Sequence, residues 1–102
     1  MSIRFQIDRS GNFSPDTQQD ARIGDTVSFV LADGATFSMV YIFSGSAAPD
    51  STLFGTTSVR TANVATILSS AVLNQVYTLS VSETLFKGEE TVIKNGTIKV
   101  GS

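Results

Sequence analysis

Apolar and polar residues alternate along several short stretches of this chain. The clearest stretches are residues 3–7, 27–31, 76–82 and 97–100. Successive side chains of a strand point to opposite faces, so a period of two predicts β-strands with one buried face. Turn residues separate these stretches, among them Asp33-Gly34, a dipeptide typical of hairpin turns.

Residues 36–44 form the most apolar run, and they are apolar on both faces. One face carries Phe37, Met39, Tyr41 and Phe43, and the other carries Val40 and Ile42. A strand of this kind is either covered twice within its own domain or covered on its second face by a partner chain. In the first case we expect Met39, Tyr41 and Phe43 to fill the interior, with Val40 and Ile42 under the loop at 45–57. In the second case Val40 and Ile42, or Leu53 and Phe54 in that loop, would pack on another protomer.

Two further short strands are predicted near Val59 and at 64–68. The stretch 64–73 also fits a short helix, because Val64, Leu68 and Val72 are spaced four residues apart. We favour strand there, because β-branched residues are frequent in it. About eight short strands separated by turns predict one all-β domain over 1–102, an antiparallel Greek-key β-sandwich.

Composition and charge narrow the classes of function. The 102 residues include 7 Lys and Arg, 9 Asp and Glu, no His and no Cys. A chain without a basic surplus is not expected to bind nucleic acid or an anionic membrane. Without imidazole or thiolate, nucleophilic catalysis and soft-metal binding lack their usual groups, so we expect no enzyme activity and no cofactor. Glu83 with Lys94 is the residual catalytic pair.

Asp16, Asp20 and Asp25 lie close together in sequence, but their spacing does not match a calcium loop, and solvated turns are the favoured interpretation. No apolar stretch is long enough to span a bilayer, and the first residues do not resemble a signal peptide. We therefore expect a cytoplasmic location, or secretion if the N-terminus is trimmed from a longer chain.

Three segments together resemble the cupredoxins, the blue-copper β-sandwich proteins. FSP at 13–15, followed by IGDTVSFV at 23–30, is similar to the opening of that family. YTLSV at 77–81 is similar to the strand that carries its copper thiolate, and KNGTIKV at 94–100 is similar to its closing strand. The resemblance implies a cupredoxin-like Greek-key sandwich.

The same resemblance places the copper-ligand positions on residues that cannot serve. The two His positions correspond to Phe37 and Thr84, the Cys position to Val81 and the axial Met position to Lys94. A type 1 copper site needs two imidazoles and a thiolate, and this chain has neither group. The resemblance therefore implies a scaffold without copper or electron transfer, in which Phe37 and Val81 form an apolar plug.

These observations favour a non-catalytic binding or structural module that acts through protein–protein contact or self-association. The expected contact residues are Val40, Ile42, Leu53 and Phe54, and the expected partner is a second copy of the chain or another protein. The alternative is a module that binds a small molecule or a carbohydrate. Its site would be the loop end formed by Phe37, Thr84, Leu85 and Phe86.

Overall fold

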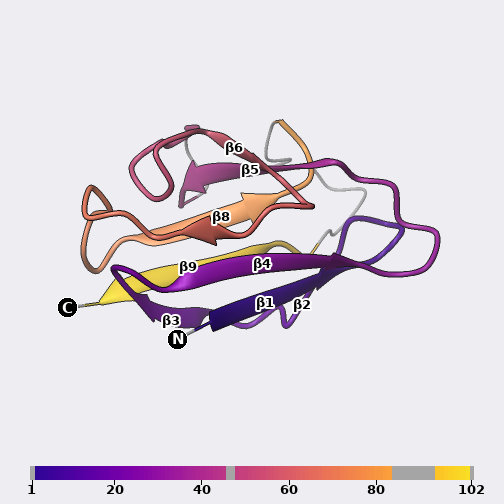
Figure 1. The fold of residues 1–102 in the computed structure, drawn as a ribbon, viewed down its shortest axis with the longest axis horizontal. Coiled ribbons are helices and arrows are strands. Elements are labelled where there is room, and N and C mark those ends of the chain that lie inside the picture. Colours follow the sequence, from indigo (N-terminus) through magenta and orange to yellow (C-terminus); the bar gives the residue numbers. More distant parts are fainter. Residues whose placement is uncertain (1, 46–47, 84–93, 102) are drawn as a thin grey trace.

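The computed structural model describes residues 2–45, 48–83 and 94–101, and it contains nine strands in those ranges. The first sheet has the spatial order β2 (Phe13–Ser14), β1 (Ser2–Ile7), β4 (Thr26–Leu31) and β7 (Ala65–Thr66). The second has the order β3 (Gln19–Arg22), β9 (Gly96–Gly101), β8 (Val76–Ser80), β5 (Met39–Ser44) and β6 (Ser58–Arg60). The two sheets pack face to face (Figure 1), which confirms the predicted all-β sandwich.

The strand pairing is mixed, whereas the sequence predicted an antiparallel sandwich. β1 pairs with β4 in parallel, and β3 pairs with β9 in parallel, while the other pairs are antiparallel. Parallel neighbours need a long connection between them. The chain makes that connection by leaving β1 through β2, crossing to β3 in the other sheet, and returning as β4.

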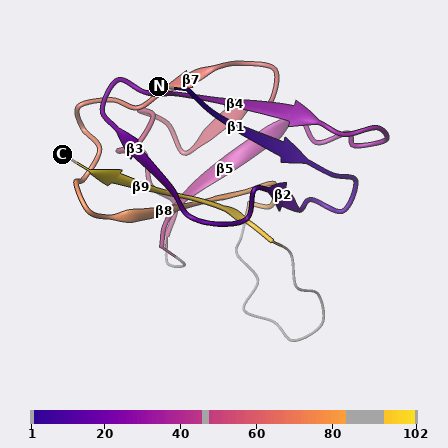
Figure 2. The same ribbon diagram turned by 90° about the horizontal axis from the view of Figure 1, so that it is seen from below.

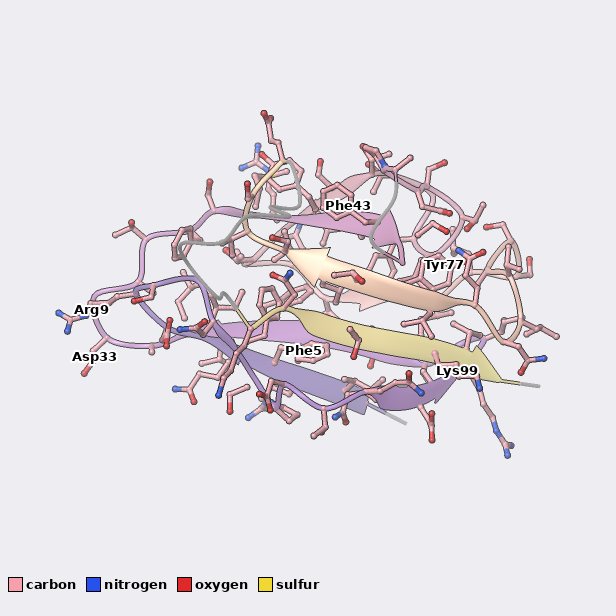
Figure 3. The ribbon with its side chains drawn as sticks, turned by 180° about the vertical axis from the view of Figure 1, so that it is seen from behind. Phe5, Arg9, Asp33, Phe43, Tyr77 and Lys99 are labelled. Carbon is pink, nitrogen blue, oxygen red and sulfur yellow. The ribbon has the colours of Figure 1, made fainter. Side chains whose placement is uncertain are left out.

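A cluster of three phenylalanines occupies the core at one end of the first sheet. The ring of Phe5 lies 5.6 Å from that of Phe13 in an edge-to-face arrangement, and 6.3 Å from that of Phe29. Phe5 is fully buried in the core, and Figure 3 shows it where the strands of the two sheets overlap in the view. Gly96 at the start of β9 is buried against this cluster, because a Cβ atom there would lie 2.9 Å from Cδ2 of Phe13. The opening and closing strands therefore meet through aromatic packing.

The predicted orientation of residues 36–44 is wrong. Val40 and Ile42 are fully buried in the core between the sheets, while Met39 and Tyr41 are half-buried on the opposite face. Phe43 is buried on that outer face, where it forms a bridge with Pro49 of the following loop. Because both faces of this run are apolar, its period could not show which face meets the other sheet. The loop covers the outer face at Phe43.

Two strands were missed and one ambiguity is resolved. β2 and β3 lie in a polar stretch in which Ala21 is the residue that β3 buries. The apolar pattern of β3 is too weak to predict it, because this strand is held in place by pairing with β9.

The stretch 64–73 contains the short strand β7 followed by turns and no helix, as favoured from the sequence.

Candidate functional site

The two sheets end on short strands along one flank of the sandwich. β6 is the edge strand of the second sheet. β7 is the edge strand beside β4 in the first sheet (Figure 2). A groove of about 470 Å³ lies along these two strands and the turns next to them. We call it the β6–β7 groove. Its apolar lining consists of Met39, Phe54, Val59, Val64, Ala65 and Leu68.

The groove is open to solvent although much of its lining is apolar. Val64 is 64 % exposed and Leu68 is 40 % exposed. Phe54 and Val59 are partly buried and pack against the core from the floor of the groove. Single exposed aliphatic residues are ordinary on protein surfaces, but several around one depression are typical of an interaction site.

Hydrogen bonds between two loops fix one wall of the groove. The backbone N–H of Leu68 donates to the carbonyl of Leu53 at 3.0 Å, and the Ser70 hydroxyl donates to the carbonyl of Thr52 at 2.8 Å. Gly55 has a φ of +82°, and a Cβ atom there would lie 3.0 Å from Cδ1 of Leu68. The glycine thus lets Leu68 lie directly over the loop.

The polar residues that line the groove carry hydroxyl or amide groups, with the exception of Arg60. Thr56, Ser58, Asn63 and Thr66 provide the uncharged polar groups, and Arg60 provides the one charge in the lining. Arg60 is exposed at the end of β6, and no carboxylate of residues 2–45, 48–83 and 94–101 forms an ion pair with it. The groove therefore combines an apolar floor with a single positive charge.

Three of the four predicted interface residues are in the wrong place for contact with a partner. Val40, Ile42 and Leu53 are all fully buried inside the protomer, so another chain cannot reach their side chains in this fold. Phe54 is the exception, because it is half-buried and lines the β6–β7 groove. The reason is the inverted face of β5, together with a loop that folds Leu53 into the core.

Two positions that were expected from the sequence to form an apolar plug, Phe37 and Val81, lie close to the same turn residue. A Cβ atom on Gly11, whose φ is +90°, would lie 2.8 Å from Cγ2 of Val81 and 3.6 Å from Cζ of Phe37. The backbone N–H of Lys94 donates to Oδ1 of Asn12 at 2.8 Å. Phe37 and Val81 both pack against the core, so they occupy this end as apolar filling. The other predicted ligand-site residues, Thr84, Leu85 and Phe86, lie outside the described residues.

A polar depression of about 420 Å³ lies at the same end, lined by Asp8, Asn12, Asp16 and Lys94 among others. Phe37 is not part of that lining. Hydrogen bonds, led by the one from the Asn12 N–H, hold the pKa of Asp8 below its ordinary value of 3.8. Lys94 Nζ lies 3.6 Å from Oδ2 of Asp16 in an exposed ion pair. The bond from Lys94 to Asn12 and the ion pair from Lys94 to Asp16 join the start of the closing segment to the 8–12 turn and the residues that follow it.

Among the described residues no three acidic side chains form a group that could hold a metal ion, so Asp16, Asp20 and Asp25 do not converge. Lys94 pairs with Asp16, and Glu83 is exposed. Within the same residues, no helix has the length and apolarity that crossing a membrane requires.

Sequence reasoning missed the groove residues Val64, Leu68 and Arg60. Val64 and Leu68 lie in the stretch whose apolar spacing also suggested a helix, and a surplus of apolar residues there was the available signal. Arg60 carried no signal, since nothing in its sequence neighbourhood shows that β6 ends beside β7. Comparison with known proteins adds no relative, because no family model, no curated protein and no solved structure matches this chain.

Proposed function

We propose that this chain is a non-catalytic binding or structural module that acts through contact with another protein chain, either a second copy or a different protein. The observation that carries the proposal is the β6–β7 groove. Its floor includes Phe54 and Val59, which pack against the core, and its most exposed aliphatic residues, Val64 and Leu68, are 64 % and 40 % exposed.

The physical gain from covering this surface is large enough to support association. Full burial of an aliphatic side chain stabilises by about 1.5–3 kcal/mol, and each of these two residues is roughly half exposed. Phe54 and Val59 would lose their remaining contact with water at the same time. A few well-packed side chains in a pocket commonly supply most of the free energy of a protein contact.

The loop end supports a cupredoxin-like frame for this module. The positions that the sequence resemblance assigns to one His and to the Cys are Phe37 and Val81, and they lie side by side at Gly11. The position assigned to the axial ligand, Lys94, is tied to the neighbouring Asn12. We therefore propose that this end is an apolar closure of the sandwich, which leaves the groove as the binding surface.

The substitution Val64→Asp tests this function, with Leu73→Asp as the matched control. Leu73 is 43 % exposed and lies outside the groove lining, so both changes place a carboxylate on an exposed aliphatic position. Sedimentation equilibrium over a wide concentration range measures self-association, and affinity capture from the native cell measures other partners. We expect Val64→Asp to abolish an association that wild type and Leu73→Asp both show. A monomeric wild type whose captured proteins are the same for both variants would overturn the proposal.

A further inference from the structure

We infer that the β6–β7 groove receives a protein segment that presents apolar side chains beside one acidic side chain, and that Arg60 selects the acid. The inference rests on the proposed function and names the chemistry of the partner. It is drawn from three features of the groove: its charge, its backbone and its floor.

The charge of the groove is unbalanced. Arg60 is its one charged lining residue, is exposed, and forms no ion pair within the described part of the chain. The whole chain carries a net charge of −2, so this guanidinium is a local exception on an acidic protein. A guanidinium pairs with a carboxylate through two parallel charge-assisted hydrogen bonds, which gives geometric specificity as well as affinity.

Three outward-facing backbone groups of β6 already have hydrogen-bond partners within the chain. The N–H of Ser58 donates to Oγ1 of Thr56 at 3.4 Å, and that hydroxyl donates to the carbonyl of Ser58 at 3.1 Å. The carbonyl of Arg60 accepts the N–H of Asn63 at 3.0 Å. A partner strand would have to displace these bonds in order to extend the sheet, so strand addition is disfavoured here. Recognition must therefore come from side chains.

The floor of the groove demands apolar contacts from the same segment. Phe54 and Val59 form a surface backed by the core, and Val64 and Leu68 project beside it. An acidic segment without apolar side chains would meet Arg60 but leave this floor exposed. An apolar segment without an acid would fill the floor and leave the guanidinium beside an uncharged surface. The combination satisfies both.

Two fluorescent peptides with blocked ends provide the test. Both have the same alternating Leu and Thr core, and one ends in Glu where the other ends in Lys, so that a side-chain carboxylate is the sole acid. Fluorescence anisotropy with the full chain measures each affinity. We expect wild type to bind the Glu peptide roughly tenfold more tightly, the factor that corresponds to about 1.4 kcal/mol. Arg60→Glu should reverse the preference.

Arg22→Glu is the matched control, because Arg22 is an exposed arginine in β3, at the opposite edge of the second sheet. It should keep the wild-type preference. If Arg60→Glu leaves the preference unchanged while Val64→Asp abolishes binding of both peptides, the inference is overturned and the proposed function stands. Absence of binding by either peptide at millimolar concentration also overturns it. So does a wild-type dimer that Val64→Asp dissociates, because the groove then holds a second copy.

Discussion

The buried hydroxyl of Tyr77 connects two loops, and its removal by Tyr77→Phe is the most informative perturbation of stability. Tyr77 is fully buried at the start of β8, with its ring in the core. Its hydroxyl oxygen accepts the backbone N–H of Val72 at 2.8 Å and shares a hydrogen bond of 2.7 Å with Oγ1 of Thr52. The Thr52 hydroxyl and N–H in turn donate to Oδ1 of Asp50.

The expected loss follows from what the substitution leaves unpaired. Phenylalanine preserves the ring packing, so the hydrophobic contribution is nearly unchanged. The N–H of Val72, in a part-buried hydrogen bond, loses the partner that the structure gives it, and a donor left unpaired away from water costs about 1–3 kcal/mol. The Thr52 hydroxyl keeps its bond to Asp50, which limits the loss on that side. We expect the free energy of unfolding to fall by about 1–3 kcal/mol, and each kcal/mol corresponds to roughly 4–8 °C in Tm for a domain of this size.

Urea unfolding followed by far-UV circular dichroism measures this change, with Tyr41→Phe as the control. Tyr41 is half-buried on the outer face of β5, and no residue in the described ranges hydrogen-bonds to its hydroxyl. Its substitution should change the free energy of unfolding by less than about 0.5 kcal/mol, as is usual for surface positions. The slope of the unfolding curve should stay constant in both variants, because neither changes the surface exposed on unfolding.

A double-mutant cycle with Thr52→Val separates the hydroxyl pair from the rest. Residues that share a hydrogen-bond network show interaction energies of about 0.5–3 kcal/mol, and independent residues add. We expect Tyr77 and Thr52 to be coupled within that range. A loss for Tyr77→Phe no larger than that for Tyr41→Phe, or additive effects in the cycle, would show that this network does not stabilise the loops.

Two other predictions concern the core and acid stability. Ile42→Asp puts an unpaired charge at a fully buried position, so it should unfold the chain or cost more than about 4 kcal/mol. A folded variant that loses less than this in urea unfolding would contradict the placement. Burial raises the pKa of Asp50, but hydrogen bonds from Thr52 and Gln75 outweigh it and leave the pKa below 3.8. The resulting stabilisation is present above pH 3.8 and is lost as the pH falls through the lowered pKa. Asp50→Asn should flatten the dependence of the urea midpoint on pH below that value, and an unchanged slope would disprove it.

Local pattern was enough to locate most strands. The alternation at 3–7, 27–31 and 76–82 matches β1, β4 and β8. In a half-buried strand, successive side chains point alternately to the core and to solvent, so apolar and polar residues alternate in the sequence. Pattern failed for β3, whose polar residues are held in place by pairing with β9. It also failed for the orientation of β5, because both faces of that strand carry apolar side chains.

The candidate site was much less accessible to sequence reasoning. Phe54 was identified because the loop pair Leu53-Phe54 adds apolar residues beyond what one small core needs, and it does line the groove. The side chain of its neighbour Leu53 is fully buried in the core. The backbone carbonyl of Leu53 accepts a hydrogen bond from the N–H of Leu68. Whether an apolar loop residue joins the core or the surface depends on contacts with distant segments, which the sequence around it does not contain.

By itself, the sequence determined the class of fold and the limits of the chemistry. Period-two alternation encodes strands locally, and the absence of His and Cys removes thiolate and imidazole wherever the chain folds. The tertiary structure alone decided which apolar residues remain on the surface. β7 is an edge strand of the first sheet, and β6 is an edge strand of the second. Arg60, Val64 and Leu68 therefore come together only when the two sheets pack. A binding surface made across two sheets is a property of their packing, and no single segment carries its pattern.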